Sequence, residues 1–208
     1  MSGSLAIVVC GPQLEVAFKG PEQEVASLVR LTGVSPRSTL VLAAADLLVE
    51  DAGLEPSAID RVLVTRGPGS FTGIRAGIAT AQGLAAASGA EIVAYDSLLV
   101  QAARCDGELE LWAAQPGRRG EVYGRAFGIR PGEVPNTVGA IEVLAVESLT
   151  GDRLWIAPEA LDLGIARRAV PVMSAAEALL RLDSLGARPQ PVEPLYVEGP
   201  PIQTANRK

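Results

Sequence analysis

A glycine-rich loop at residues 67–73 (GPGSFTG) separates a short apolar run from a long helical pattern. The run Arg61 to Thr65 predicts a strand, and apolar residues spaced three and four apart predict a helix from about Thr72 to Ser88. A second strand pattern follows at Glu91 to Tyr95. Because a strand, a helix and a strand in this order are typical of α/β sheets, the sequence predicts an α/β fold.

Strand and helix signals also alternate before the loop. Two apolar runs, Leu5 to Val9 and Leu14 to Phe18, predict a β-hairpin, and Val25 to Leu31 predicts a third strand. Residues 35–52 predict a helix, since a serine suited to the N-cap is followed by proline at the first helical position. Gly53 is expected to end this helix.

After Tyr95 the signals weaken, and we place a lobe boundary near Asp106. The N-terminal lobe is then 1–105, with the loop and both helices, and 106–208 is a less regular C-terminal lobe with an extended, proline-rich tail. The pattern at 129–150 is ambiguous. The other elements predicted here are a helix at 97–104, a hairpin of 109–114 and 121–127, strands at 155–157 and 170–172, and a helix at 174–185.

The chain contains no histidine among its 208 residues, which limits its chemistry. Ser-His-Asp and Cys-His catalysis and histidine-ligated metal sites are excluded together. The only lysines, Lys19 and Lys208, leave little room for a Ser-Lys pair, and Cys10 and Cys105 predict neither a disulfide framework nor a zinc site. Carboxylate chemistry or binding remains, and we expect no metal and no cofactor.

The charge and aromatic content disfavour direct nucleic-acid binding. The formal net charge is −6 and aromatic residues make up 4%, so neither a basic face nor a set of stacking platforms is expected. The apolar run Leu40 to Val49 is too short to cross a bilayer and contains Asp46. Since the N-terminus does not resemble a leader, we expect a cytoplasmic protein.

Both predicted helices have more small and apolar surface than a sheet-packing helix requires. The second has a core stripe, Ile74, Ile78, Ala81 and Ala85, and an opposite face of small residues, Thr72, Ala76, Ala79, Gly83 and Ala86. The first is apolar around most of its circumference, with a narrow polar strip of Thr39, Asp46 and Glu50. Either this chain covers the outer faces itself, or they join an intermolecular helix bundle.

The glycine loop permits two interpretations. Free N–H groups at a helix N-terminus form a candidate phosphate site with Gly67, Gly69 and Ser70, and Asp96 stands where a ribose-binding acid would lie. The loop is not a Walker A motif, however, and it misses the dinucleotide fingerprint by one residue. The other interpretation is a tight turn in which Ser70 or Thr72 caps the helix.

The stretches 64–77 and 79–85 resemble the signature of the TsaB (YeaZ) family, with supporting matches at 93–98, 118–123 and 194–197. The resemblance implies a two-lobed actin/hexokinase-type (ribonuclease H-like) fold, with mixed sheets and flanking helices. It also implies a role in making threonylcarbamoyladenosine at position 37 of tRNA, as the non-catalytic partner of the transferase TsaD. The nucleotide-hydrolysing TsaE is a further implied partner, tRNA is reached only through the complex, and the isolated subunit is expected to form a homodimer.

In this family the two helices form the docking bundle, so the resemblance implies a partner-binding set of Thr39, Leu42, Ala43, Asp46, Thr72, Arg75, Ala76, Ala79 and Gly83. The sequence departs from the family pattern at residues 7–11, which lack the usual carboxylate, and at 35–38 and 116–120. These changes weaken the case for nucleotide hydrolysis. The alternative that stays open is a nucleotide-binding enzyme of this fold, or of a doubly wound fold, that uses the glycine loop; a peptidase is disfavoured by the missing histidine.

Overall fold

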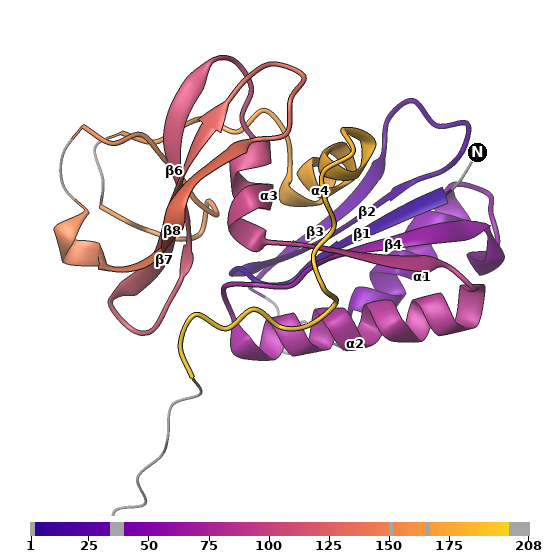
Figure 1. Cartoon of the computed structure of the whole chain (residues 1–208). Coiled ribbons are helices and arrows are strands. Elements are labelled where there is room, and N and C mark those ends of the chain that lie inside the picture. The colour runs from indigo at the N-terminus through magenta and orange to yellow at the C-terminus, as the bar shows by residue number, and fades with distance from the viewer. Residues whose placement is uncertain (1–2, 34–39, 150–151, 165–166, 200–208) are drawn as a thin grey trace, which may run out of the picture.

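The chain folds around two mixed β-sheets with flanking helices (Figure 1), in a computed structural model that describes residues 3–33, 40–149, 152–164 and 167–199. The first sheet has the strand order β3-β2-β1-β4-β5 and the second the order β8-β7-β6-β9. In the first sheet β1 pairs antiparallel with β2 and parallel with β4, while in the second β6 pairs antiparallel with β7 and parallel with β9. The predicted architecture of mixed sheets with flanking helices is therefore confirmed.

The first sheet and its helices follow the sequence prediction closely. The elements are β1 (Gly3–Val8), β2 (Gln13–Lys19), β3 (Ser27–Thr32), α1 (Leu40–Asp51), β4 (Ile59–Thr65), α2 (Phe71–Ser88), β5 (Glu91–Tyr95) and α3 (Ser97–Ala103), with a 3-10 turn at Pro56–Ala58. Helix α1 ends two residues before Gly53, which has a φ of 67°. The serine and proline predicted to start this helix lie outside the described residues.

Each face of the first sheet carries its own helical layer. On one face α1 and α2 pack side chains such as Val41, Leu48, Ile74 and Ile78 against alternate residues of the strands. On the opposite face α3 and α4 (Ala175–Ser184) pack against the remaining strand residues, and Figure 1 shows α4 and α2 on opposite sides of the sheet. Because strand side chains alternate between faces, a sheet buried on both sides needs the nearly continuous apolar runs that the sequence has.

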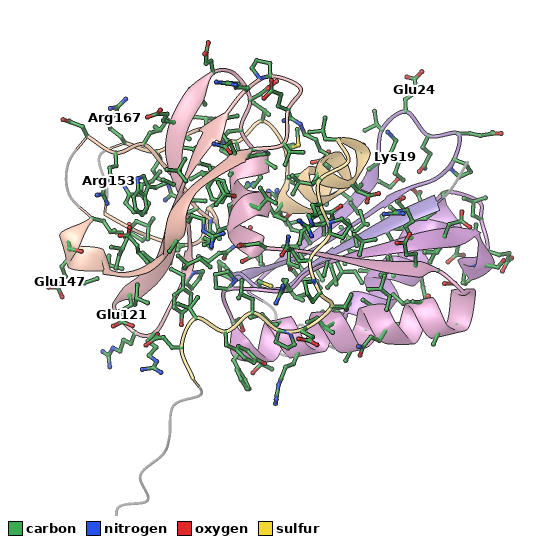
Figure 2. All side chains as sticks on the ribbon, viewed as in Figure 1. Lys19, Glu24, Glu121, Glu147, Arg153 and Arg167 are labelled. Carbon is green, nitrogen blue, oxygen red and sulfur yellow. The ribbon has the colours of Figure 1, made fainter. Side chains whose placement is uncertain are left out.

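The second sheet follows α3 and is covered less completely. Its strands are β6 (Leu109–Pro116), β7 (Glu121–Ile129), β8 (Asn136–Ala145) and β9 (Trp155–Ile156), with a 3-10 turn at Val146–Ser148. Helix α3 lies between the sheets, because Leu98 and Ala102 pack against the second sheet while Val100 and Ala103 pack against the first. Charged side chains such as Lys19, Glu24, Arg153 and Arg167 extend outward around the molecule (Figure 2).

Two expectations for the second half change. The ambiguous segment at 129–150 contains β8, a mostly exposed edge strand that shows little apolar periodicity. The strand predicted at 170–172 is wrong: Val170 and Val172 are 83% and 62% exposed, and the nearby isolated bridge to Trp155 is made by Arg168, before the segment. Two exposed valines cannot pack on a core, so their β propensity is overridden.

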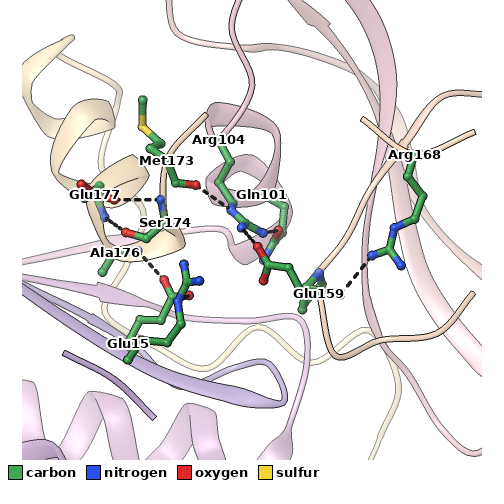
Figure 3. Close-up of polar contacts among 11 residues, drawn as sticks. Glu15, Gln101, Arg104, Glu159, Arg168, Met173, Ser174, Ala176 and Glu177 are labelled. Atoms are coloured by element: carbon green, nitrogen blue, oxygen red, sulfur yellow. Dashed lines mark hydrogen bonds and ion pairs between the residues drawn. The ribbon is translucent and has the colours of Figure 1, made fainter. Parts of the chain in front are cut away.

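A network of polar side chains joins the end of α3, the start of α4 and the loop after β9 (Figure 3). Arg104 is 1% exposed; its Nε donates to the Met173 carbonyl at 3.2 Å, and its guanidinium also pairs with Glu159. Glu15 of β2 accepts the Ala176 N–H at the start of α4, at 3.0 Å. Helix α4 thus lies beyond the lobe boundary placed near Asp106 yet packs on the first sheet, and that boundary stays a prediction.

Candidate functional site

The outer faces of α1 and α2 carry exposed side chains along both helices, and the chain itself contacts this surface at Arg75, through Tyr196. Leu42 and Leu47 of α1 are 51% and 56% exposed, although large apolar side chains are usually buried. On α2, Arg75 and Ala79 are exposed one turn apart. We call this surface, Leu42, Ala43, Asp46, Leu47, Thr72, Arg75, Ala79 and Gly83, the docking face.

The docking face contains most of the partner-binding set predicted from the sequence. Leu42, Ala43, Asp46, Thr72, Arg75, Ala79 and Gly83 are exposed, Ala76 is half-buried, and Thr39 lies outside the described residues. A Cβ added at Gly83 would meet no atom within 4 Å, so the helix backbone itself is open there to a close neighbour. The predicted set omitted Leu47, although a large apolar residue beside Asp46 in the polar strip of α1 was a usable signal.

The core stripe of α2 holds this face outward. Ile74, Ile78, Ala81 and Ala85 are buried as predicted, which fixes the rotation of the helix on the sheet. Gly77 packs so closely on the residue after β1 that an added Cβ would lie 2.5 Å from the Val9 side chain. Small residues therefore occur on both sides of α2, for close contact with the sheet on one side and an open surface on the other.

The glycine loop packs against the end of β1. A Cβ added to Gly69 would lie 2.3 Å from the Cys10 carbonyl oxygen, and one added to Gly67 would lie 2.5 Å from the Leu195 carbonyl oxygen. Both glycines have a positive φ. The Ser70 N–H donates to the Cys10 carbonyl at 2.7 Å, and the Ser70 side chain caps α2 by accepting the Gly73 N–H. These contacts give the glycines a packing role; the phosphate site at Gly67, Gly69 and Ser70 stays a prediction.

Asp96, a candidate ribose-binding acid in the nucleotide interpretation, caps α3. Its Oδ1 accepts the Leu98 N–H at 2.7 Å and its Oδ2 pairs with Arg125 at 3.0 Å. Burial raises the pKa of this carboxyl, while the Leu98 N–H and Arg125 oppose the rise. Both oxygens therefore have protein partners, and Asp96 does not line the cleft described next.

A cleft of about 460 Å³ lies between the first sheet and the β6–β7 hairpin. The loop after β1 and the start of α2 form one wall, and Arg118 and Tyr123 belong to the other. Residues 195–199 also line it, which brings the distant C-terminal segment to the glycine loop. Among the described residues, no cluster of three or more Cys, Asp or Glu side chains could hold a metal ion.

Cys10 borders this cleft, but its thiol is buried. The sulfur donates a hydrogen bond to Thr65 Oγ1 at 3.0 Å, and burial raises the thiol pKa from 9.0 to about 12. Burial also raises the pKa of the Cys105 thiol. Since the thiolate is the reactive form, neither cysteine suits nucleophilic catalysis.

We expect both thiols to resist modification in the folded protein. With Ellman's reagent at pH 8, reaction should be slower than in concentrated urea by about 100-fold or more, because reaction requires opening of the structure. The Cys105→Ser variant isolates the reaction of Cys10. Rapid reaction of Cys10 in the native variant would contradict the burial described for it.

None of the helices in the described part of the chain is long and apolar enough to span a membrane.

Comparison with known proteins gives consistent relatives. Residues 33–134, which include α1 and α2, match the family model of TsaD, tRNA N6-adenosine threonylcarbamoyltransferase. The chain is 32% identical over 119 residues to the tRNA threonylcarbamoyladenosine biosynthesis protein TsaB of Escherichia coli K12, a match covering 52% of this chain and 51% of that protein. This chain therefore aligns with only about half of that relative. It is also 32% identical over 154 residues to an uncharacterized Mycobacterium tuberculosis H37Rv protein, covering 72% of this chain and 69% of that protein.

A solved structure extends the likeness to nearly the whole chain. YeaZ from Pseudomonas aeruginosa matches with a TM-score of 0.76 at 24% identity, covering 95% of this chain and 100% of that one. This match confirms the predicted fold class. The sequence relatives and the TsaD-type match confirm the resemblance read from residues 64–85, and the chain belongs to the TsaB (YeaZ) family.

Proposed function

We propose that this chain is a non-catalytic subunit that docks a TsaD-type transferase in the formation of threonylcarbamoyladenosine at position 37 of tRNA. The carrying observation is the docking face, which exposes Leu42 and Leu47 beside the small residues of α2. Exposed apolar side chains at a helix pair favour burial against another protein. The name of the E. coli relative, a threonylcarbamoyladenosine biosynthesis protein, supports the pathway.

The match to the TsaD family model supports the proposed mode of docking. The TsaD family model matches the part of this chain that contains α1 and α2, so a TsaD-type protein is expected to carry two corresponding helices. Two related helix pairs can pack face to face in a pseudo-symmetric bundle, as two copies of one chain do about a two-fold axis. The same face would then form a homodimer when the chain is alone, and the two assemblies would compete.

The missing histidine and the burial of both cysteines support a subunit without chemistry of its own. The sequence has no histidine, and both cysteines are buried. Chemistry would then belong to the TsaD-type partner, with a TsaE-type ATPase as a further component, and the acidic chain would reach tRNA only through the complex. We place this role in the cytoplasm.

Solution mass tests the proposal directly. Light scattering of the chain alone, and then mixed with the TsaD-type protein of the same organism, should show a homodimer that gives way to a one-to-one complex. Failure to associate, even with tRNA and nucleotide present, would refute docking as the function.

A nucleotide-binding enzyme remains the second candidate, because the 460 Å³ cleft adjoins the glycine loop. Calorimetric titration of the isolated chain with ATP and ADP discriminates between the two. Clear binding by the chain alone would favour the enzyme, whereas binding only in the presence of the partner would favour the subunit.

A further inference from the structure

The segment at residues 193–199 connects the two halves of the molecule along the cleft. In Figure 1 the yellow chain that follows α4 runs along the first sheet to the start of α2 and on toward the β6–β7 hairpin, and residues 193–199 are its last described part. Four of its residues, Leu195, Tyr196, Glu198 and Gly199, line the cleft. We call this segment the strap.

The first part of the strap is bound to the first half of the molecule. The Leu195 N–H donates to the Arg66 carbonyl at 2.7 Å, and the Arg66 Nε donates back to the Glu193 carbonyl at 2.9 Å. The Tyr196 ring stacks on Phe71 with the ring centroids 5.0 Å apart. Arg75 contacts both rings: its guanidinium carbon lies 4.6 Å from the Phe71 centroid, and its Nε donates to the Tyr196 hydroxyl at 3.2 Å.

The last part of the strap is bound to the second half. Arg118 pairs with the Glu198 carboxylate at 3.2 Å and donates to the Gly199 carbonyl at 3.0 Å. The Tyr123 hydroxyl donates to the other oxygen of Glu198, also at 3.2 Å. The Glu198 carboxylate thus binds the Arg118 guanidinium and the Tyr123 hydroxyl, which the hairpin presents to the cleft.

We propose that the strap closes the cleft in the isolated chain and is released when a partner engages Arg75. The strap can detach at low cost in free energy, because Arg118 is about half exposed and exposed ion pairs contribute little stability. Arg75 belongs to the docking face and to the strap contact, so a partner that takes Arg75 competes with Tyr196 for it. Only this release step rests on the proposed docking function.

Closure is tested in the isolated chain by comparing Glu198→Gln with Glu193→Gln. Both variants lose one carboxylate from the strap. Glu193, however, contacts Arg66 through its backbone carbonyl, so Glu193→Gln keeps this hydrogen bond. Hydrogen exchange at the Leu195 amide should quicken up to about fivefold in Glu198→Gln, the range of one exposed ion pair, and stay unchanged in Glu193→Gln. Equal exchange in the two variants would overturn the role of Glu198.

Tyrosine titration by ultraviolet absorbance gives an independent readout. Burial raises the pKa of Tyr123, and the hydrogen bond to Glu198 and its charge raise it further. Glu198→Gln should therefore lower the pKa of Tyr123, which Tyr123→Phe identifies in the titration.

Release is tested by measuring association and exchange on the same sample of chain and TsaD-type partner. Association with quicker exchange at Leu195 supports release. Association with unchanged or slower exchange overturns release while leaving docking intact. Failure to associate refutes docking instead, and the comparison of Glu198→Gln with Glu193→Gln still decides closure.

Discussion

A glutamate in place of Ala79 is expected to abolish association with the TsaD-type partner while leaving the isolated chain folded. Ala79 is exposed in the centre of the docking face, so the new side chain meets only water in the monomer. In a close helix crossing the carboxylate would be desolvated without a partner, which costs about 3–5 kcal/mol. This corresponds to a loss of affinity of more than about 100-fold, measurable by calorimetry or light scattering.

Ala140→Glu is a matched control, because Ala140 is an exposed alanine on β8 of the second sheet. It adds the same charge to the chain, so it separates a local effect from a change in net charge. Both variants should keep the wild-type circular dichroism and unfolding midpoint. Wild-type affinity in Ala79→Glu would show that α2 is not part of the interface. An equal loss of affinity in both variants would indicate long-range charge repulsion instead.

The first half of the fold was predictable because each element has a local signal. Short apolar runs predicted strands β1 to β5 to within a few residues. Helical spacing and the helix-ending Gly53 did the same for α1 and α2. Local signals also placed α4, whose capping box joins Ser174 and Glu177. They could not show that α4 packs on the first sheet, because that contact depends on long-range partners such as Glu15, 161 residues from Ala176.

The candidate site was predictable where it lies on one helix and not where it joins distant segments. Helical spacing separated the buried stripe of α2 from its exposed face, and the structure has both as predicted. The strap was expected only as an extended tail. Its contact between Tyr196 and Phe71 joins residues far apart in the sequence, and no periodicity encodes such a pairing.

Gly73→Ala is expected to destabilise the fold although alanine is the better helix former. Gly73 lies in the first turn of α2, where an added Cβ would lie 2.0 Å from the Val9 carbonyl oxygen. Because that atom belongs to the backbone, relief requires α2 or the end of β1 to move, and overpacking of this kind costs about 1–3 kcal/mol or more. Urea unfolding should show this loss in the free energy of unfolding.

Gly83→Ala makes the same substitution in the same helix with the opposite expected sign. A Cβ there meets no atom within 4 Å, so only helix propensity changes, and the free energy of unfolding should rise by about 0.5–1 kcal/mol. A difference of opposite sign between the two variants means that the glycine loop is fixed by contact with β1. If both variants gain stability, the loop has room at Gly73, and its glycines need another explanation, of which an anion held by the loop is the first to test.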